Sequence, residues 1–195
     1  MINISKLLAA SESDKHYISS SSNSKGRLVH KYGPIYDFVF LSQYCKLKRP
    51  LRILEIGVAT GESLVVWSQI DYVEQVVGID PGMNPTIKFN NKIHYTKHDG
   101  YSADTINFLK ETYNGFDIII DDGPHELIYQ KYFFENYFQL LNEGGLMMCE
   151  DVYTNNLKDI LELKKHFELY VIDLTQNINT DNNEIIVFRF KDNIL

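Results

Sequence analysis

Cysteine, long apolar runs and basic residues are all scarce in this chain. Its two cysteines, Cys45 and Cys149, are too few for a disulfide framework, and Cys149 falls in an apolar run typical of a buried strand. No apolar run approaches the roughly 20 residues that span a bilayer. The amino terminus has a short apolar patch but lacks the core of a signal peptide. These absences predict a cytoplasmic protein with reduced thiols and no membrane partner.

Basic side chains are outnumbered, with 19 Lys and Arg against 26 Asp and Glu and a formal net charge of -7. The resulting pI of about 5.3 disfavours a polyanionic partner such as nucleic acid, although a local basic patch can override the average. The length of 195 residues and the 44% hydrophobic content suit one domain with a sizeable core.

Short apolar runs alternate with helix-like stretches from residue 51 onward. Seven strands are predicted, near 51–56, 75–79 and 93–97, from Phe116, from Gly145, and near 169–174 and 184–190. Helices are predicted near 35–44, 61–70, 103–113, 126–141 and 157–166. This alternation predicts an α/β fold with a doubly wound, Rossmann-like, mainly parallel sheet and helices on both faces. The polar loop 175–183 has no room for a helix, so we expect the last strand to be antiparallel.

The amino-terminal part of the chain has a different composition. Residues 11–25 are rich in serine and poor in apolar side chains, and Pro34 then opens an apolar helix-like stretch. We therefore predict that residues 1–33 form an amino-terminal segment or lid and that residues 34–195 form the main domain.

Two acidic clusters each follow an apolar run. The first run ends in Asp121 and Asp122 and leads into His125, and the second ends in Glu150 and Asp151. Because residues just past the carboxyl ends of parallel strands face the ligand crevice, these side chains are expected to converge on one site. Carboxylates gathered at buried strand ends repel one another unless a cation lies between them, so the pattern favours a metal site.

Each of these residues also has a simpler interpretation. Asp122 could cap the helix near 126–141, Asp151 could cap the helix after it, and His125 could be a surface residue of a first turn. Glu150 is harder to explain in this way, because it directly follows an apolar run.

A glycine turn follows the first predicted strand and opens a helix. Gly57 allows a tight turn and the close approach of a ligand to backbone N–H groups. Asp80, at the end of the next strand, is placed to accept hydrogen bonds from a ribose. The spacing between Gly57 and Gly61 differs from G-x-G-x-x-G, which disfavours a nicotinamide dinucleotide but admits other adenosine-containing cofactors.

Three stretches resemble successive motifs of class I S-adenosylmethionine-dependent methyltransferases: residues 54–61 (LEIGVATG), 78–80 (GID) and 98–100 (HDG). The resemblance extends over roughly 51–190, and the strand count with an antiparallel last strand also matches that fold. It implies that residues 34–195 form the methyltransferase domain.

The same resemblance implies roles in binding S-adenosyl-L-methionine. Gly57 would lie beside the methionine end of the cofactor, Asp80 would bind the ribose hydroxyls, and Asp99 would lie near the adenine amino group. The remaining residues that it implies for cofactor binding are Glu55, Gly61 and Asp121.

The acidic clusters carry a narrower resemblance. The stretch 121–125 (DDGPH), followed by Glu150 and Asp151 after a Gly-Gly strand, is similar to the macrocin O-methyltransferase group of metal-dependent sugar O-methyltransferases. This resemblance implies that Asp122, Glu150 and Asp151 hold Mg²⁺ and that His125 is the general base. Residues 14–15 and 30–36 also look like the amino-terminal segment of that group. Tyr32 and Tyr36 could cover the cofactor, but Tyr36 fits equally well on a packed helix face. Pro124 departs from the small polar residue usual there.

The chemistry of hydroxyl methylation fits such a residue set. A sugar hydroxyl is a poor nucleophile until it is partly deprotonated. A hard divalent cation held by carboxylates lowers the pKa of a hydroxyl, and an imidazole can accept its proton. The sequence thus predicts a magnesium-dependent O-methyltransferase that acts on a small-molecule acceptor, expected to be a sugar.

Three other functions remain open from the sequence. An RNA ribose 2′-O-methyltransferase would need a Lys-Asp-Lys-Glu tetrad, which Asp122, Lys158 and Glu184 could form with Lys15 or Lys25. A non-catalytic cofactor-binding subunit and a nicotinamide-dependent oxidoreductase also remain open, because fold does not fix function. The aromatic stretch 129–138 could join copies in a homo-oligomer.

Overall fold

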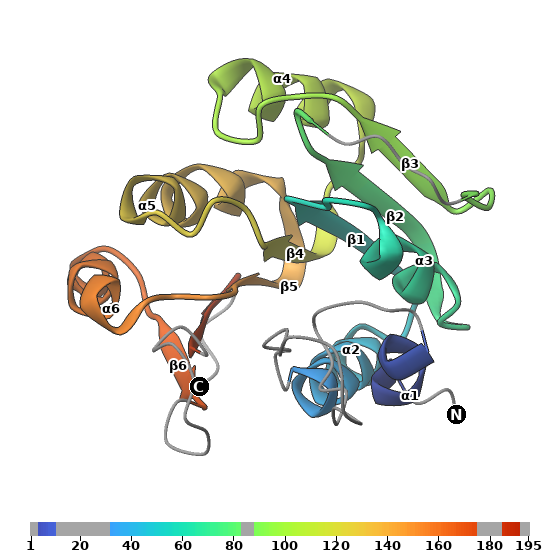
Figure 1. Cartoon of the computed structure of the whole chain (residues 1–195), viewed down its shortest axis with the longest axis horizontal. Helices are drawn as coiled ribbons and strands as arrows, with labels where there is room; N and C mark the ends of the chain where they lie inside the picture. The colour runs from blue at the N-terminus through green and yellow to red at the C-terminus, as the bar shows by residue number, and fades with distance from the viewer. Residues whose placement is uncertain (1–3, 11–31, 83–87, 175–184, 192–195) are drawn as a thin grey trace, which may run out of the picture.

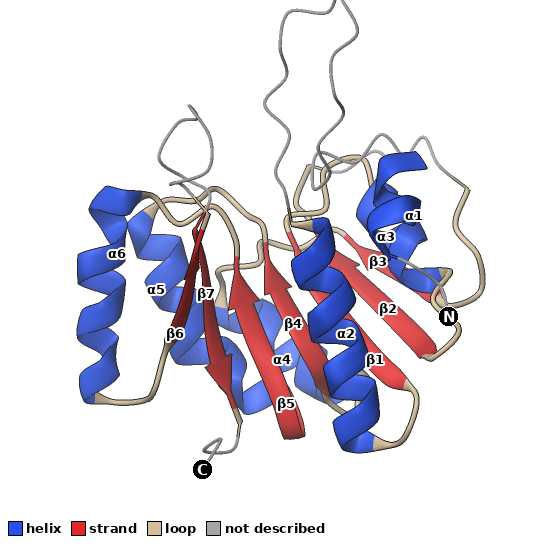
Figure 2. Cartoon of the chain, turned by 90° about the horizontal axis from the view of Figure 1, so that it is seen from below, coloured by secondary structure: helices blue, strands red, loops and turns tan. Residues whose placement is uncertain are grey.

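The described residues of the computed structural model, 4–10, 32–82, 88–174 and 185–191, form a twisted sheet between two helical layers (Figures 1 and 2). The strands are β1 (Leu51–Ile56), β2 (Val73–Ile79), β3 (Ile93–Thr96), β4 (Phe116–Asp121), β5 (Leu141–Cys149), β6 (Tyr170–Asp173) and β7 (Ile185–Phe190). The helices are α1 (Ile4–Ala10), α2 (Gly33–Leu47), α3 (Glu62–Ser68), α4 (Ala103–Thr112), α5 (Leu127–Asn136) and α6 (Thr154–Leu161), with short 3₁₀ helices η1 (Tyr137–Leu140) and η2 (Glu162–Lys165).

The strand order is β3-β2-β1-β4-β5-β7-β6. Strands β1 to β5 pair in parallel, whereas β7 pairs antiparallel with both β5 and β6. The order reverses at β1, with β2 on one side and β4 on the other. The predicted doubly wound, mainly parallel sheet with an antiparallel last strand is confirmed.

Each face of the sheet has its own apolar core. Helices α1, α2 and α3 cover one face, where Phe40 and Trp67 pack with strand residues such as Ile118 (Figure 1). Helices α4, α5 and α6 cover the other face, where Phe133 packs with strand residues such as Ile119. Every residue of β4 is buried, as expected for a central strand covered on both faces.

Some predicted boundaries differ from the structure. The helix predicted over 126–141 ends as α5 at Asn136 and continues as the 3₁₀ helix η1. Strand β5 begins at Leu141 rather than Gly145, because its pairing with β4 shifts register and Gly144 has a φ of +77°. A bulge of this kind lets the strand pass through glycines that the pattern marks as a boundary.

Helix α1 lies inside the predicted amino-terminal segment. Ile4 and Leu8 are fully buried, and the Ile4 N–H donates to a carboxylate oxygen of Asp37 in α2 over 2.6 Å. Residues 11–31, which make up most of the predicted lid, lie outside the described residues. The lid and its boundary at residue 33 stay predictions.

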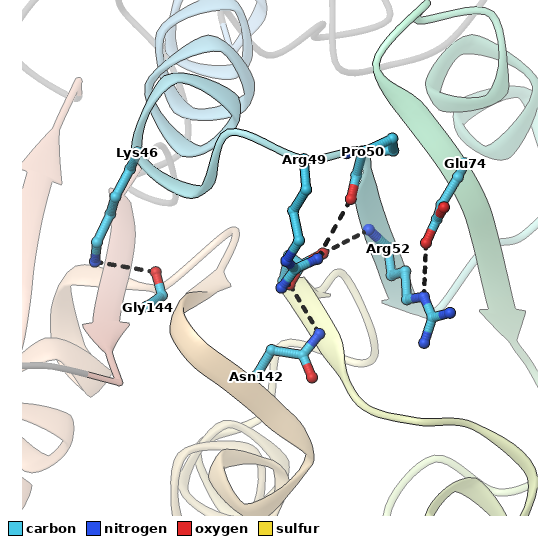
Figure 3. Close-up of polar contacts among 8 residues, drawn as sticks. Lys46, Arg49, Pro50, Arg52, Glu74, Asn142 and Gly144 are labelled. Atoms are coloured by element: carbon cyan, nitrogen blue, oxygen red, sulfur yellow. Dashed lines mark hydrogen bonds and ion pairs between the residues drawn. The ribbon is translucent and has the colours of Figure 1, made fainter.

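The buried carboxylate of Asp117 connects the amino ends of three strands, and Figure 3 labels its partners Arg49, Arg52 and Asn142. Asp117 in β4 accepts two hydrogen bonds from the Arg49 guanidinium, at 2.9 and 2.6 Å, just before β1. It also accepts from the Arg52 N–H over 2.9 Å and from the Asn142 amide of β5 over 2.8 Å. The amino ends of these strands, at the opposite end of the sheet from the acidic clusters, are therefore fixed by charge-assisted hydrogen bonds.

No helix within the described ranges is long and apolar enough to cross a membrane.

Candidate functional site

A cavity of about 710 Å³ opens at the carboxyl ends of β1, β2 and β4. Its lining includes Gly57 after β1, Asp80 after β2, and Asp122 and His125 after β4, with Asp99 from the loop after β3. This is where a ligand binds in open α/β sheets, beside the strand at which the order reverses. The volume suits a small-molecule ligand.

The turn after β1 packs directly against the end of β4. The Gly57 N–H donates to the Ile79 carbonyl over 2.9 Å, and the Asp122 N–H donates to the Ile56 carbonyl over 2.9 Å. A Cβ atom at Gly57 would lie 2.2 Å from the Asp122 carbonyl oxygen, and its φ is +79°. Glycine is therefore required at position 57 by both the backbone conformation and the neighbouring strand. Gly61, with a φ of +88°, caps α3 and does not line the cavity.

The carboxylates of Asp80 and Asp99 both line the cavity. Asp80 Oδ2 accepts from the Ala59 N–H over 3.2 Å, which connects the ends of β1 and β2, and Oδ1 accepts from the Gly82 N–H over 2.7 Å. Asp99 Oδ1 accepts from the Tyr101 N–H over 2.9 Å. Backbone donors thus fix both carboxylates at the cavity wall.

Two predicted cofactor residues lie behind the cavity wall instead of in it. The Glu55 carboxylate is fully buried and accepts from Ser63 Oγ over 2.9 Å and from the Trp67 indole over 2.8 Å. Asp121 accepts from the Tyr101 hydroxyl over 2.5 Å, and burial raises the pKa of Asp121 to about 6. Ser63 and Tyr101 line the cavity, so Glu55 and Asp121 are connected to the cavity only through hydrogen bonds to these two residues.

A group of three possible metal ligands, Asp122, His125 and Asp151, adjoins the cavity. Asp122, His125 and Asp151 each offer a ligand atom, and these atoms all lie within 4.8 Å of one another. His125 Nε2 lies 3.7 Å from Asp151 Oδ2. His125 and Asp151 have φ angles of +60° and +51°, a left-handed conformation that residues other than glycine rarely adopt. Two carboxylates and an imidazole at this spacing can hold a divalent cation.

Glu150, the third predicted carboxylate ligand, does not belong to this cluster of ligand atoms. Its side chain is 1% exposed, and its N–H donates to the Asp121 carbonyl over 2.9 Å. The structure thus brings together Asp122 and Asp151 from the predicted ligands, with the predicted base His125 beside them. The role of Glu150 as a ligand stays a prediction.

Neither Asp122 nor Asp151 is the N-cap residue of a helix. The N-cap residue is Glu126 for α5 and Tyr153 for α6, and neither of these two makes a side-chain capping hydrogen bond. The interpretation of the two aspartates as N-cap residues is therefore wrong.

Two buried residues, Tyr32 and Gln130, support the second acidic cluster. The sequence suggests Tyr32 only as a cover for the cofactor, but Tyr32 is buried in the core and does not line the cavity, and the sequence analysis does not name Gln130. The Tyr32 hydroxyl donates to Asp151 Oδ1 over 2.5 Å, and burial followed by the charges of Asp151 and Glu150 raises the pKa of this phenol far above 10. Gln130 Nε2 lies 3.4 Å from the carbonyl oxygens of Glu150 and Asp151. Gln130 could have been suspected from the sequence, because it is a polar side chain within the apolar stretch of the predicted 126–141 helix. The sequence offers no signal for the Tyr32 contact, which joins residues 119 positions apart.

Aromatic side chains complete the cavity wall. Tyr101 and Tyr129 both line the cavity, and their ring centroids lie 4.7 Å apart. Because Tyr101 also donates to Asp121, this wall is fixed to the end of β4.

Known methyltransferases resemble the chain in sequence. One relative is the Streptomyces olivaceus 3′-O-methyltransferase that acts on 8-demethyl-8-(2-methoxy-α-L-rhamnosyl)-tetracenomycin C. It is 27% identical over 141 residues, which cover 68% of this chain and 35% of the relative. Another is the mycinamicin VI 2″-O-methyltransferase of Micromonospora griseorubida, at 29% identity over 133 residues, 65% of this chain and 32% of the relative. The chain thus spans about a third of the length of these curated relatives.

A solved structure has the same fold. The MycE methyltransferase of the mycinamycin biosynthetic pathway, in complex with Mg, S-adenosylhomocysteine and mycinamycin VI, superposes with a TM-score of 0.65 at 25% identity. The match covers 82% of this chain and 39% of that one. A second MycE structure, with Mg and S-adenosylhomocysteine, gives a TM-score of 0.70 at 22% identity over 96% of this chain and 54% of that one.

A sequence model of one protein family matches residues 54–152, which make up half of the chain and include the glycine turn and both acidic clusters. The chain belongs to this family, the methyltransferase domain family.

Proposed function

We propose that this protein uses S-adenosyl-L-methionine and Mg²⁺ to methylate a hydroxyl group of a sugar or a sugar-containing small molecule. The observation that carries the proposal is the shared position of Asp122 and His125, which line the cavity and also belong to the cluster with Asp151. A methyl donor in the cavity and a cation in the cluster would therefore be neighbours. The acceptor class is supported by the relatives, which are named for methylation of sugar-bearing compounds.

The cavity residues fit S-adenosyl-L-methionine. Asp80, fixed by the Ala59 and Gly82 N–H groups, would accept hydrogen bonds from the ribose hydroxyls. Asp99 would lie near the adenine amino group, and the Gly57 backbone near the methionine end. Glu55, Gly61 and Asp121 would hold this wall in shape rather than contact the cofactor.

The cluster residues fit a hard divalent cation. Carboxylate oxygens are the ligands that Mg²⁺ prefers in proteins, and Mg²⁺ uses few of them. Asp122 and Asp151 would bind it, and Glu150 remains the predicted third ligand. When bound, the cation supplies a lower pKa for an acceptor hydroxyl and fixes its direction.

His125 would accept the proton of the acceptor hydroxyl. As the acceptor oxygen bonds to the methyl carbon, the carbon–sulfur bond breaks, and the sulfonium becomes the neutral thioether of S-adenosylhomocysteine. His125 Nε2 lies 3.7 Å from Asp151 Oδ2, so the base would stand beside the carboxylate that binds the cation. General-base assistance typically contributes about 10²–10⁴-fold to the rate, and much of the rest would come from alignment of oxygen, carbon and sulfur.

Methylation of an RNA ribose is less well supported. The tetrad needs Lys158, which is exposed on α6 and does not line the cavity. Glu184 and both candidates for the second lysine, Lys15 and Lys25, lie outside the described residues.

The test combines cofactor binding with turnover. Calorimetry should detect binding of S-adenosyl-L-methionine, and a panel of glycosides should yield methylated product that is lost with a chelator and restored by Mg²⁺. Asp122→Asn should abolish the response to Mg²⁺ while leaving cofactor affinity nearly intact. Full activity in chelator would contradict the role of the metal, and absent cofactor binding would contradict the whole proposal. Cofactor binding without metal binding would favour a non-catalytic subunit.

A further inference from the structure

Tyr32 joins the start of α2 to the second acidic cluster. It directly precedes α2, its side chain is fully buried, and its hydroxyl donates to Asp151 Oδ1 over 2.5 Å. A buried hydrogen bond to a charged acceptor is short and strong, and it holds the acceptor group in one orientation.

The two oxygens of Asp151 consequently have different neighbours. Oδ1 accepts from Tyr32, whereas Oδ2 faces His125 Nε2 at 3.7 Å. The backbone beneath the carboxylate is also held, because Gln130 Nε2 lies 3.4 Å from the Asp151 carbonyl oxygen. Rotation of the carboxylate would break the bond to Tyr32 and leave a buried hydroxyl without its acceptor, which is costly.

We propose that Tyr32 is a positioning residue that reserves Asp151 Oδ1, leaves only Oδ2 for a cation, and thereby selects Mg²⁺ over Ca²⁺. This inference rests on the divalent-cation site of the proposed function. It adds a residue from outside the acidic clusters and a reason for metal preference.

The physical basis is the different demand of the two ions. Ca²⁺ takes six to eight oxygen ligands and often binds both oxygens of one carboxylate, whereas Mg²⁺ uses an octahedral shell with few carboxylates and several waters. A carboxylate with one oxygen engaged by a buried phenol suits the magnesium shell. Freed from the phenol, the same carboxylate could offer both oxygens to the larger ion.

The test is calorimetric titration of the full chain with MgCl₂ and, separately, with CaCl₂. In Tyr32→Phe the Mg²⁺ affinity should fall about 10–100-fold, as is typical when a partner of a metal ligand is removed. The Ca²⁺ affinity should fall less, so that the ratio of the two affinities shifts toward calcium. An unchanged ratio, or a shift toward magnesium, would overturn the role of Tyr32.

Tyr137→Phe is the matched control. Tyr137 is also fully buried, and its hydroxyl donates over 2.5 Å to the Gly100 carbonyl, in the core on the other face of the sheet. It should lose comparable stability but keep the wild-type affinity ratio. A shift of the ratio in this control as large as that in Tyr32→Phe would overturn the proposal, because any buried hydroxyl would then have the effect.

Two further outcomes separate this inference from the proposed function. A wild-type chain that binds neither ion overturns the metal site and the role of Tyr32 together, whereas wild-type binding with an unaltered Tyr32→Phe ratio overturns Tyr32 alone. Should Tyr32→Phe fail to fold, a wild-type crystal soaked in MnCl₂ decides the question. The ion should lie on Asp151 Oδ2 with Tyr32 still on Oδ1, and an ion bound by both oxygens would overturn the inference.

Discussion

Backbone strain is concentrated around the candidate site. Within the described ranges, four residues other than glycine have positive φ angles, and Ala59, His125 and Asp151 are three of them. Ala59 and His125 line the cavity, and Asp151 belongs to the cluster with Asp122. Conformations of this kind cost about 1–3 kcal/mol each and persist where surrounding contacts over-determine them. Hydrogen bonds from Tyr32 and Gln130 provide such contacts at Asp151.

Gly57 offers a test at the scale of one residue. In Gly57→Ala the new Cβ would lie 2.2 Å from the Asp122 carbonyl oxygen, at a φ of +79°. The free energy of unfolding should fall by at least about 1–3 kcal/mol, from the strained backbone alone. The displaced Asp122 should also weaken Mg²⁺ binding. Urea unfolding and calorimetry measure the two effects.

Gly82→Ala is the control for this prediction. Its Cβ would meet only Asp80 Oδ1, at 3.7 Å, which is ordinary contact. Wild-type stability in Gly57→Ala, or an equal loss in both variants, would show that the turn after β1 does not depend on the end of β4.

Individual site residues could be predicted where local sequence fixes their position. Asp122 and His125 lie within four residues of the end of β4 and Asp151 within two of the end of β5, and strand adjacency alone predicts that they lie together. Glu150 precedes Asp151 by one residue, and the sequence does not indicate that its carboxylate lies outside the cluster. The partner of Asp151 could not be predicted either, because Tyr32 reaches it only through the packing of α2 on the sheet.

At the scale of elements, hydrogen bonds to Asp117 stabilise the amino ends of β1, β4 and β5 (Figure 3). Arg49→Met would remove both guanidinium hydrogen bonds from a carboxylate that is 0% exposed. The Arg52 N–H and Asn142 would remain as its donors. Loss of a partner from a buried charged group costs about 1–3 kcal/mol or more, so chemical unfolding should show at least that decrease.

Arg52→Met provides the comparison within the same segment. Its guanidinium bonds Glu74 over 2.8 Å, but the two side chains are 31% and 44% exposed. An exposed ion pair contributes about 0–1 kcal/mol, so this variant should remain close to wild type. Equal losses in the two variants would mean that burial of Asp117 does not set the strength of the network.

Elements with a clear period could be predicted from sequence, whereas their ends could not. All residues of β4 are buried, and its apolar run is unmistakable. Strand β5 instead starts four residues before its predicted start at Gly145, because pairing with β4 continues through a bulge at the glycines. Helix α1 has only seven residues, and its burial depends on contact with α2, which no local pattern reports.

In the molecule as a whole, the stabilising polar network and the candidate functional site lie at opposite ends of the parallel strands. The Asp117 network lies at the amino ends of the parallel strands, and the cavity and the acidic cluster lie at the carboxyl ends. This division is typical of open α/β sheets, in which ligands bind beyond the strand carboxyl ends. The fold class follows from the alternation of strands and helices, whereas the acceptor depends on loops whose polar sequences report no ligand.

The central claim is that the strand-end carboxylates bind a divalent cation beside a methyl donor. Calorimetric titration of Mg²⁺ into the chain with S-adenosylhomocysteine tests it most directly, with Asp122→Asn, Asp151→Asn and the distant Glu74→Gln measured alongside. Wild type and Glu74→Gln should bind one Mg²⁺ with equal affinity, and each aspartate variant should bind at least about 10-fold more weakly. Absence of binding in wild type, or wild-type affinity in both aspartate variants, would contradict the claim.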